Sequence, residues 1–175
     1  MQKVKWFLTM FTVAIVCFAF NPKPKEKINW LTFAQLQEAY AKNPKPILID
    51  LYTNWCGWCR VMDRTTYTNE KVVAYINQHY YAVRYDAESK DSVRFNNKTF
   101  AYNERYKTNA VALYLSFDRL EYPNTIFLSS IDARPAPLSG YMKPKELEAP
   151  LKYFAERKSE QETFVEFNKN LKKEW

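Results

Sequence analysis

Short blocks of apolar residues separated by Pro- and Asn-containing segments predict a chain of alternating strands and helices. Residues 47–52 are apolar, rich in branched and aromatic side chains, and follow Asn43-Pro44-Lys45-Pro46, which indicates a buried strand. Further strands are expected at 28–30, 80–86 and 125–128, with an edge strand at 137–141. Helices are expected at 32–42, from about 59 onward, at 70–78, at 110–117 and from Pro144.

Capping patterns mark several of these helix starts. Thr32 to Gln35 is a capping box, and Asn69 is expected to cap the helix that follows it. Pro150 falls inside a helical stretch and predicts a kink or break there.

The last residues carry their own helical pattern. Ser159 to Glu162 reads as another capping box, and apolar residues recur from Phe164 to Trp175 at spacings of three and four. We therefore expect a C-terminal amphipathic helix over 159–175, packed on the domain. A helix that binds a partner or a membrane surface is the alternative.

Two cysteines stand where the strand 47–52 gives way to a helix. Cys56 and Cys59 are separated by Gly57 and Trp58. Unpaired N–H groups at a helix start carry partial positive charge, which stabilises a thiolate on the first cysteine. The second lies roughly one turn further on, close enough to form a disulfide. C-x-x-C in this setting indicates a redox pair.

Zinc binding and haem attachment fit the cysteine pair less well. A structural zinc site needs about four ligands, whereas the chain has three cysteines and one histidine. Cys17 lies in the N-terminal apolar segment and His79 has no second ligand near it. Haem attachment needs a histidine after the second cysteine, and Arg60 stands there. We expect no metal and no cofactor beyond the Cys56–Cys59 disulfide itself; an inert structural disulfide remains open.

Residues 47–60, ILIDLYTNWCGWCR, resemble the active-site strand and helix start of the thioredoxin superfamily. Within it, the chain is similar to the C-terminal domain of DsbD and to extracytoplasmic thioredoxin-like proteins of Bacteroidetes type. The likeness extends from Ile28 to Arg157 and includes Tyr122-Pro123 before a strand and Gly140-Tyr141 before a helix. It implies a thioredoxin-like α/β fold over 28–158, with a central mixed sheet flanked by helices.

The resemblance assigns catalytic roles to three residues. Cys56 is expected to attack a substrate disulfide, and Cys59, expected to be more buried, to resolve the mixed disulfide. Asp50 matches the buried aspartate that helps to remove the proton from the second cysteine. An aspartate in an apolar strand is costly, and desolvation should raise its pKa. An aspartate at a locally wet strand end is the alternative.

The same resemblance implies a substrate-binding surface around the cysteines. Pro123 matches the family's cis-proline, which leaves the backbone of Tyr122 free to pair with an extended substrate. An ordinary proline at a strand start is the alternative. Trp55, Gly57 and Trp58 complete this surface. No histidine stands between the cysteines, so one source of thiolate stabilisation is missing and the expected bias is toward a reductant.

Residues 87–121 form an insertion, because a minimal thioredoxin needs less chain there. Within it, residues 93–100 indicate a small hairpin that turns at Asn96-Asn97. The insertion either shapes a substrate groove beside the active site or covers a sheet edge.

The first twenty residues are typical of an export signal. Lys3 and Lys5 precede the mostly apolar residues 6–20, which are shorter than the ~20-residue apolar stretch of a spanning helix. Cleavage after Ala19, lipid attachment at Cys17 and an uncleaved membrane anchor are all open. Each places the body outside the cytoplasm, in the periplasm, behind a Pro/Lys-rich tether at 21–27.

These observations favour a thiol:disulfide oxidoreductase that reduces protein disulfides outside the cytoplasm. Its partners would be disulfide-bonded proteins and a membrane thiol reductant of DsbD type. The formal net charge is +7, but the lysines are scattered and no nucleic-acid motif occurs. A disulfide oxidase or isomerase, and a redox-inactive module that binds a partner, are the alternatives.

Overall fold

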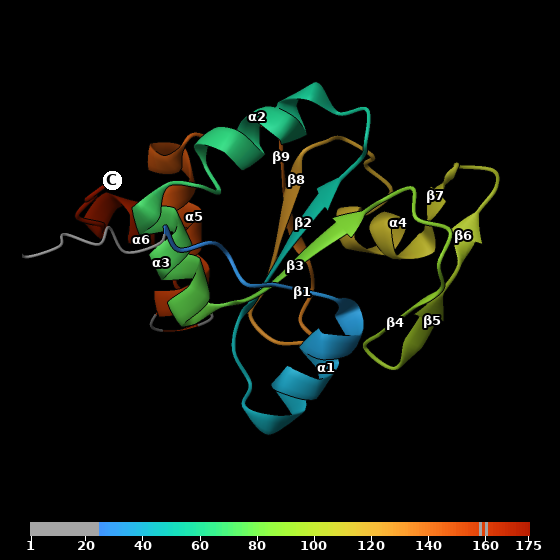
Figure 1. Cartoon of the computed structure of the whole chain (residues 1–175). Coiled ribbons are helices and arrows are strands. Elements are labelled where there is room, and N and C mark those ends of the chain that lie inside the picture. The colour runs from blue at the N-terminus through green and yellow to red at the C-terminus, as the bar shows by residue number, and fades with distance from the viewer. Residues whose placement is uncertain (1–24, 158, 160) are drawn as a thin grey trace, which may run out of the picture.

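The computed structural model describes residues 25–157, 159 and 161–175. Its centre is a five-stranded mixed sheet in the order β1-β3-β2-β8-β9 (Figure 1). β1 and β2 run parallel to β3, whereas β8 runs antiparallel to β2 and β9 antiparallel to β8. The strands are β1 (Trp30–Leu31), β2 (Ile47–Tyr52), β3 (Tyr81–Asp86), β8 (Asn124–Leu128) and β9 (Ala136–Ser139). The predicted fold class is confirmed, whereas the predicted signal at 1–20 and most of the tether at 21–27 lie outside the described residues.

Helices cover both faces of this sheet (Figure 1). They are α1 (Phe33–Lys42), α2 (Gly57–Thr65), α3 (Glu70–His79), α4 (Ala110–Ser116), α5 (Pro144–Glu156) and α6 (Phe164–Asn170). Alternation along β2 divides the core, because successive side chains of a strand point to opposite faces. Ile47, Ile49 and Leu51 pack with α1 and α4, whereas Leu48 packs with α2, α3 and α5.

Local capping explains where several helices begin. Thr32 and Gln35 form the predicted capping box of α1, and the Asn69 side chain accepts hydrogen bonds from two N–H groups at the start of α3. Pro144 occupies the first turn of α5. Of the kink or break predicted at Pro150, the break is wrong, since α5 continues through Pro150 to Glu156, and the kink stays a prediction. Leu147 and Leu151, both fully buried, anchor the helix on either side of the proline.

The insertion consists of two small hairpins and the helix α4, which lie together at one end of the sheet (Figure 1). β4 (Val93–Phe95) pairs with β5 (Lys98–Phe100), and β6 (Tyr102–Asn103) pairs with β7 (Thr108–Asn109). Asn96 and Asn97 turn the first hairpin with positive φ angles of 47° and 58°, as predicted. Phe95 is fully buried against α1, so this hairpin extends the core on one face of the sheet.

The C-terminal segment differs from the single helix predicted over 159–175. Its helix α6 begins after Thr163, which forms a capping box with Glu166, so Ser159 to Glu162 is not the helix start. α6 ends at Asn170, and Trp175 packs beyond it against the Tyr75 ring of α3. Both four-residue patterns satisfy the capping-box rule, so the sequence alone did not separate them.

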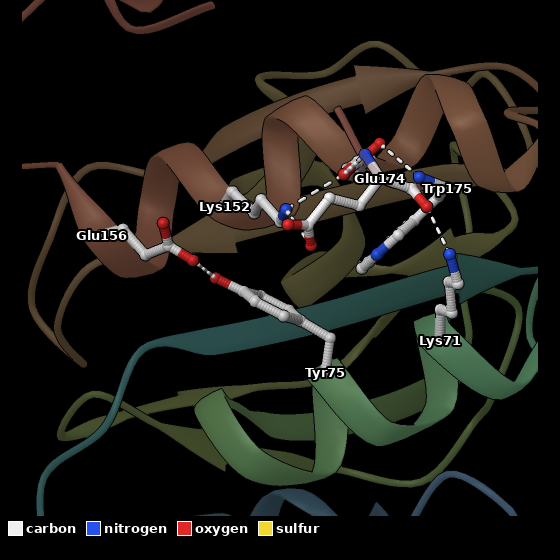
Figure 2. A network of polar contacts seen from close by, with 7 residues as sticks. Lys71, Tyr75, Lys152, Glu156, Glu174 and Trp175 are labelled. Carbon is white, nitrogen blue, oxygen red and sulfur yellow. Dashed lines mark hydrogen bonds and ion pairs between the residues drawn. The ribbon is translucent and has the colours of Figure 1, made fainter. Parts of the chain in front are cut away.

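A buried carboxylate holds the residues that follow α6. Glu148 in α5 is fully buried and accepts hydrogen bonds from the backbone N–H groups of Glu174 (2.7 Å) and Trp175 (3.1 Å) and from Lys152 Nζ (3.0 Å). Lys71 of α3 donates to the carbonyl oxygen of Glu174. Figure 2 shows the chain end lying across α3 and α5 within this network. Because these bonds fasten the chain end to α3 and α5, residues 171–175 are called the C-terminal strap.

Within the described residues, none of the helices combines the length and apolar character needed to cross a membrane.

Candidate active site

The cysteine pair lies at the N-terminus of α2, directly after the loop that leaves β2. Cys56 is the residue that caps α2, and its Sγ accepts a hydrogen bond from the backbone N–H of Cys59 at 3.1 Å. A disulfide joins the two residues, with 5.3 Å between their Cα atoms. Cys56 is 4% exposed and Cys59 3%, so the expected greater burial of Cys59 is very small in this oxidised form. A sulfur at this position receives both a direct N–H bond and the positive end of the helix dipole.

Asp50 lies in the middle of the sheet, opposite Arg84 of β3 and Thr125 of β8. It is 2% exposed. Arg84 Nε lies 3.3 Å from its Oδ2, and the Tyr67 hydroxyl donates to its Oδ1 at 3.5 Å. Burial raises the pKa of the Asp50 carboxyl from 3.8 to about 7, against the opposing effect of the Arg84 charge. A carboxyl with that pKa both holds and releases a proton near neutral pH.

Arg84 connects Asp50 to α2, the helix that begins at the cysteine pair. Its Nη2 lies 2.5 Å from Oδ2 of Asp63, which is in α2. Its guanidinium also stacks 4.3 Å above the centre of the Tyr52 ring. The negative charge of Asp63 raises the pKa of Asp50 further. Sequence reasoning missed Arg84, Asp63 and Tyr67. Arg84 could have been noticed, because an arginine inside the predicted strand 80–86 is a possible partner for a buried aspartate.

The predicted substrate-binding residue Trp55 is fixed by two contacts. Its indole N–H donates to Glu88 Oε1 at 2.8 Å, and its ring meets Tyr122 edge-on with centroids 6.0 Å apart. Glu88 lies at the start of the insertion, which the sequence did not connect to this tryptophan. The insertion thus contacts the active site through this carboxylate–indole bond and through a hydrogen bond between the side chains of Thr108 and Tyr122. Its first hairpin packs against α1.

Trp58, between the cysteines, is held by a different aromatic ring. It stacks on Tyr141 with ring centroids 5.5 Å apart and planes at 20°, and the hydroxyl oxygens of Tyr141 and Thr65 lie 3.0 Å apart. The peptide bond between Tyr122 and Pro123 is cis. The carbonyl of Pro123 accepts a hydrogen bond from the Gly140 N–H at 2.8 Å. Trp58, Tyr122 and Pro123 line one shallow cleft together with Gly140 and Tyr141.

The structure therefore brings the sequence-predicted residues together from two parts of the chain. Trp55, Cys56, Gly57, Trp58 and Cys59 come from the β2–α2 connection, and Tyr122 and Pro123 come from the start of β8. Gly57 is the first residue of α2, and a Cβ added there would meet only the far end of the Arg60 side chain, at 3.9 Å. The described residues contain no group of three His, Cys, Asp or Glu side chains placed to hold a metal ion.

Comparisons with known proteins agree with this architecture. A family model described as Thioredox_DsbH, "Protein of unknown function, DUF255", matches residues 20–175. Thioredoxin-like protein slr0233 of Synechocystis sp. is 33% identical over 61 residues, which are 35% of this chain and 55% of that protein. The thiol:disulfide interchange protein DsbD of Campylobacter jejuni (strain RM1221) is 28% identical over 60 residues, 34% of this chain and 10% of DsbD. The chain spans less than two thirds of the length of these curated relatives.

Solved structures show the same fold at low sequence identity. A DsbH oxidoreductase superposes with a TM-score of 0.55 and 15% identity, over 78% of this chain and 90% of that chain. A thioredoxin-fold protein from Helicobacter pylori gives a TM-score of 0.53 and 16% identity, over 73% and 80%. The thioredoxin-like fold expected from residues 47–60 is thereby confirmed.

Proposed function

The chain belongs to the Thioredox_DsbH family (DUF255) of thioredoxin-like proteins, and on this basis we propose that it reduces protein disulfides through Cys56 and Cys59. The observation that supports this most directly is the position of Cys56 Sγ. It caps α2 and accepts the N–H of Cys59, so the reduced form has a sulfur placed for ionisation. A thiolate is the nucleophile that thiol–disulfide exchange requires.

The exchange proceeds in two steps. The Cys56 thiolate attacks one sulfur of the substrate disulfide, which forms a mixed disulfide and releases the other substrate sulfur as a thiolate that takes a proton from water. Cys59 then loses its proton, for which Asp50 is the acceptor, and attacks Cys56 Sγ. The Cys56–Cys59 disulfide forms and the second substrate thiol leaves. Two electrons have passed from the protein to the substrate.

The proposed direction is reduction. Gly57 and Trp58 stand between the cysteines, and neither supplies a cation that would stabilise the Cys56 thiolate further. A protein whose reduced form is strongly stabilised is an oxidant. Because no residue between the cysteines adds such stabilisation, the pair is expected to act as a reductant. A fresh dithiol must then restore the reduced pair after each turnover.

The proposed setting is the periplasm, reached through the N-terminal segment 1–20. The electron source would be a membrane thiol reductant of DsbD type, and the substrates would be disulfide-bonded proteins. The local identity with DsbD of Campylobacter jejuni and the basic, then apolar, start of the chain support this proposal. No cofactor beyond the cysteine pair is needed for the exchange.

Trapping tests the proposal. In Cys59→Ser the first step should proceed and the second should not, so proteins from an extracytoplasmic extract should remain attached to Cys56 until a reductant is added. Cys56→Ser, which retains Cys59, is the matched control and should trap far less. A reduction potential of about −270 mV supports reduction, whereas one of about −120 mV indicates an oxidase. A Cys59→Ser protein that traps nothing, together with a wild type that reduces no disulfide, would overturn the proposal.

A further inference from the structure

Two tryptophan rings beside the disulfide are exposed to solvent. Trp55 is 65% exposed and Trp58 is 61%, more than most large apolar side chains of the described chain. Each is nevertheless held in place, Trp55 by Glu88 and Tyr122 and Trp58 by Tyr141. Exposed apolar surface that is rigid and clustered marks a site of contact with another molecule. Because the two rings are largely unburied, they add little to the stability of the fold, and we interpret them as a binding surface.

A cleft of about 260 Å³ opens beside the Trp58 ring. Trp58, Tyr122, Pro123, Gly140 and Tyr141 line it, so no ionisable carboxylate, lysine or arginine faces it. Gly140 has a φ of 101° and nothing within 4 Å of the place where a Cβ would lie, so the cleft stays open on that side. Small-molecule sites usually measure about 300–1,000 Å³. This cleft is smaller, and it suits one apolar side chain.

The chemistry of the neighbouring disulfide limits what enters the cleft. During exchange the substrate's sulfur bonds to Cys56, whose helix carries Trp58 on its first turn. An extended chain advances about 3.3 Å per residue, so the residues within two positions of the substrate cysteine lie within roughly 7 Å of it. Those residues must pass over the surface that contains the cleft.

Resting on the proposed function, we propose that this cleft selects substrates with an aromatic or large aliphatic side chain within two residues of the reacting cysteine. The stacked rings of Trp58 and Tyr141 form part of its wall, and Tyr122 and Pro123 also line it. The preferred substrate is an extended polypeptide segment. A small charged disulfide such as oxidised glutathione is disfavoured, because the cleft presents no charge to its carboxylates.

Peptides with a chromogenic leaving group test this specificity. Each peptide carries one cysteine as the mixed disulfide with 5-thio-2-nitrobenzoate, so attack on the peptide sulfur releases a coloured thiolate. Phe, Leu, Ala or Glu is placed one or two positions before or after the cysteine. With the reduced protein in excess, at least one Phe peptide should react about tenfold faster than its Ala counterpart, within the ~10–200-fold range of a hydrophobic pocket. The Glu peptides should be slowest.

Variants connect the preference to the cleft. Trp58→Ala and Tyr141→Ala should each bring the Phe/Ala rate ratio close to one, whereas Tyr141→Phe keeps the ring and should keep the ratio. Phe164→Ala, which removes an exposed aromatic ring from α6, is the control for surface hydrophobicity and should also keep it. If Trp58→Ala fails to fold, the two Tyr141 variants alone decide.

The outcomes separate this inference from the function on which it rests. Equal rates for all peptides, a ratio unchanged in Tyr141→Ala, or reduction of oxidised glutathione as fast as of the best peptide would each refute the cleft while leaving a disulfide reductase. Failure to react with any peptide would refute the oxidoreductase itself.

Discussion

At Asp50, burial and charge act on the same proton in opposite directions. Removal from water raises the pKa of this carboxyl to about 7, while the Arg84 guanidinium opposes the shift. Arg84 is itself shared with Asp63, so it neutralises neither carboxylate alone. Burial also raises the pKa of Tyr67 well above its usual value, and the charge of Asp50 adds to this. The phenol therefore remains a donor to Asp50 at any physiological pH.

The first prediction concerns Asp50→Asn. Because the folded pKa lies above the unfolded value of 3.8, the folded state binds the extra proton between about pH 4 and 7, and folding stability falls as the pH rises through that window. Asn removes this cost. At about 1.4 kcal/mol per pKa unit, we expect the variant to gain up to ~4 kcal/mol in unfolding free energy at pH 8 and almost none at pH 3. Urea unfolding at both pH values measures the gain, and an equal gain at both would contradict the assignment. Disulfide reduction should slow in the same variant.

The second prediction uses the partners of Asp50. Asp63→Asn removes a charge that raises the pKa of Asp50, and Arg84→Met removes one that lowers it. If ionised Asp50 takes the Cys59 proton, the acidic limb of the pH–rate profile should move to lower pH in Asp63→Asn and to higher pH in Arg84→Met. Asp118→Asn, exposed and in the left-handed region that Asn tolerates, should leave the profile unchanged. Shifts in the same direction for both variants would rule out this electrostatic role.

Among the elements, the C-terminal strap depends most on a single side chain. Burial alone would raise the pKa of Glu148, but hydrogen bonds from the N–H of Glu174, from Lys152 and from the N–H of Trp175 lower it below its usual value. A lowered pKa stabilises the fold above the unfolded value of 4.5, and this contribution is lost as the pH falls through the folded value. The strap is therefore held most firmly near neutral pH.

The third prediction tests that dependence. Glu148→Ala leaves Lys152 buried without its main partner and two backbone N–H groups without an acceptor. Breaking a buried ion pair from one side costs about 3–5 kcal/mol, which should appear as a lower unfolding free energy at pH 7 and a smaller loss near pH 3. Glu38→Ala, an exposed helical glutamate in α1, serves as the control and should change stability by less than about 0.5 kcal/mol. A Glu148→Ala loss no larger than that of the control would show that the strap contributes little.

Over the whole molecule, the sequence predicted several strands, helix caps and turns whose formation depends on neighbouring residues. The strand 47–52, the caps at Thr32 and Asn69 and the turn at Asn96-Asn97 each depend on neighbouring residues, and the structure has all of them. Interactions between distant residues were missed. Arg84 reaches Asp50 across the sheet, and Glu148 receives N–H groups from 26 and 27 residues further along the chain. Spacing rules contain no information on such pairs, so the strap was predicted as one more helical turn.

The fourth prediction concerns the distribution of stability over the whole chain. β2 is paired on both edges, with β3 and with β8, and its core side chains are buried. The β4–β5 and β6–β7 pairs are separate two-stranded ribbons, which are marginal by themselves. Amide hydrogen exchange should therefore be slowest in β2 and β8 and faster in both ribbons. Exchange from β6–β7 as slow as from β2 would show that the insertion unfolds only with the domain.

The hydrogen bond between Glu88 and the Trp55 indole connects the insertion to the residue that precedes Cys56. Ala87, next to Glu88, accepts hydrogen bonds from the Thr108 hydroxyl and the Asn109 N–H, so both ends of the ribbon region are tied to one short turn. A ligand that grips the ribbons and displaces this turn would pull on the ring adjoining Cys56. An antibody bound to the ribbons would thereby move Trp55 without touching either cysteine.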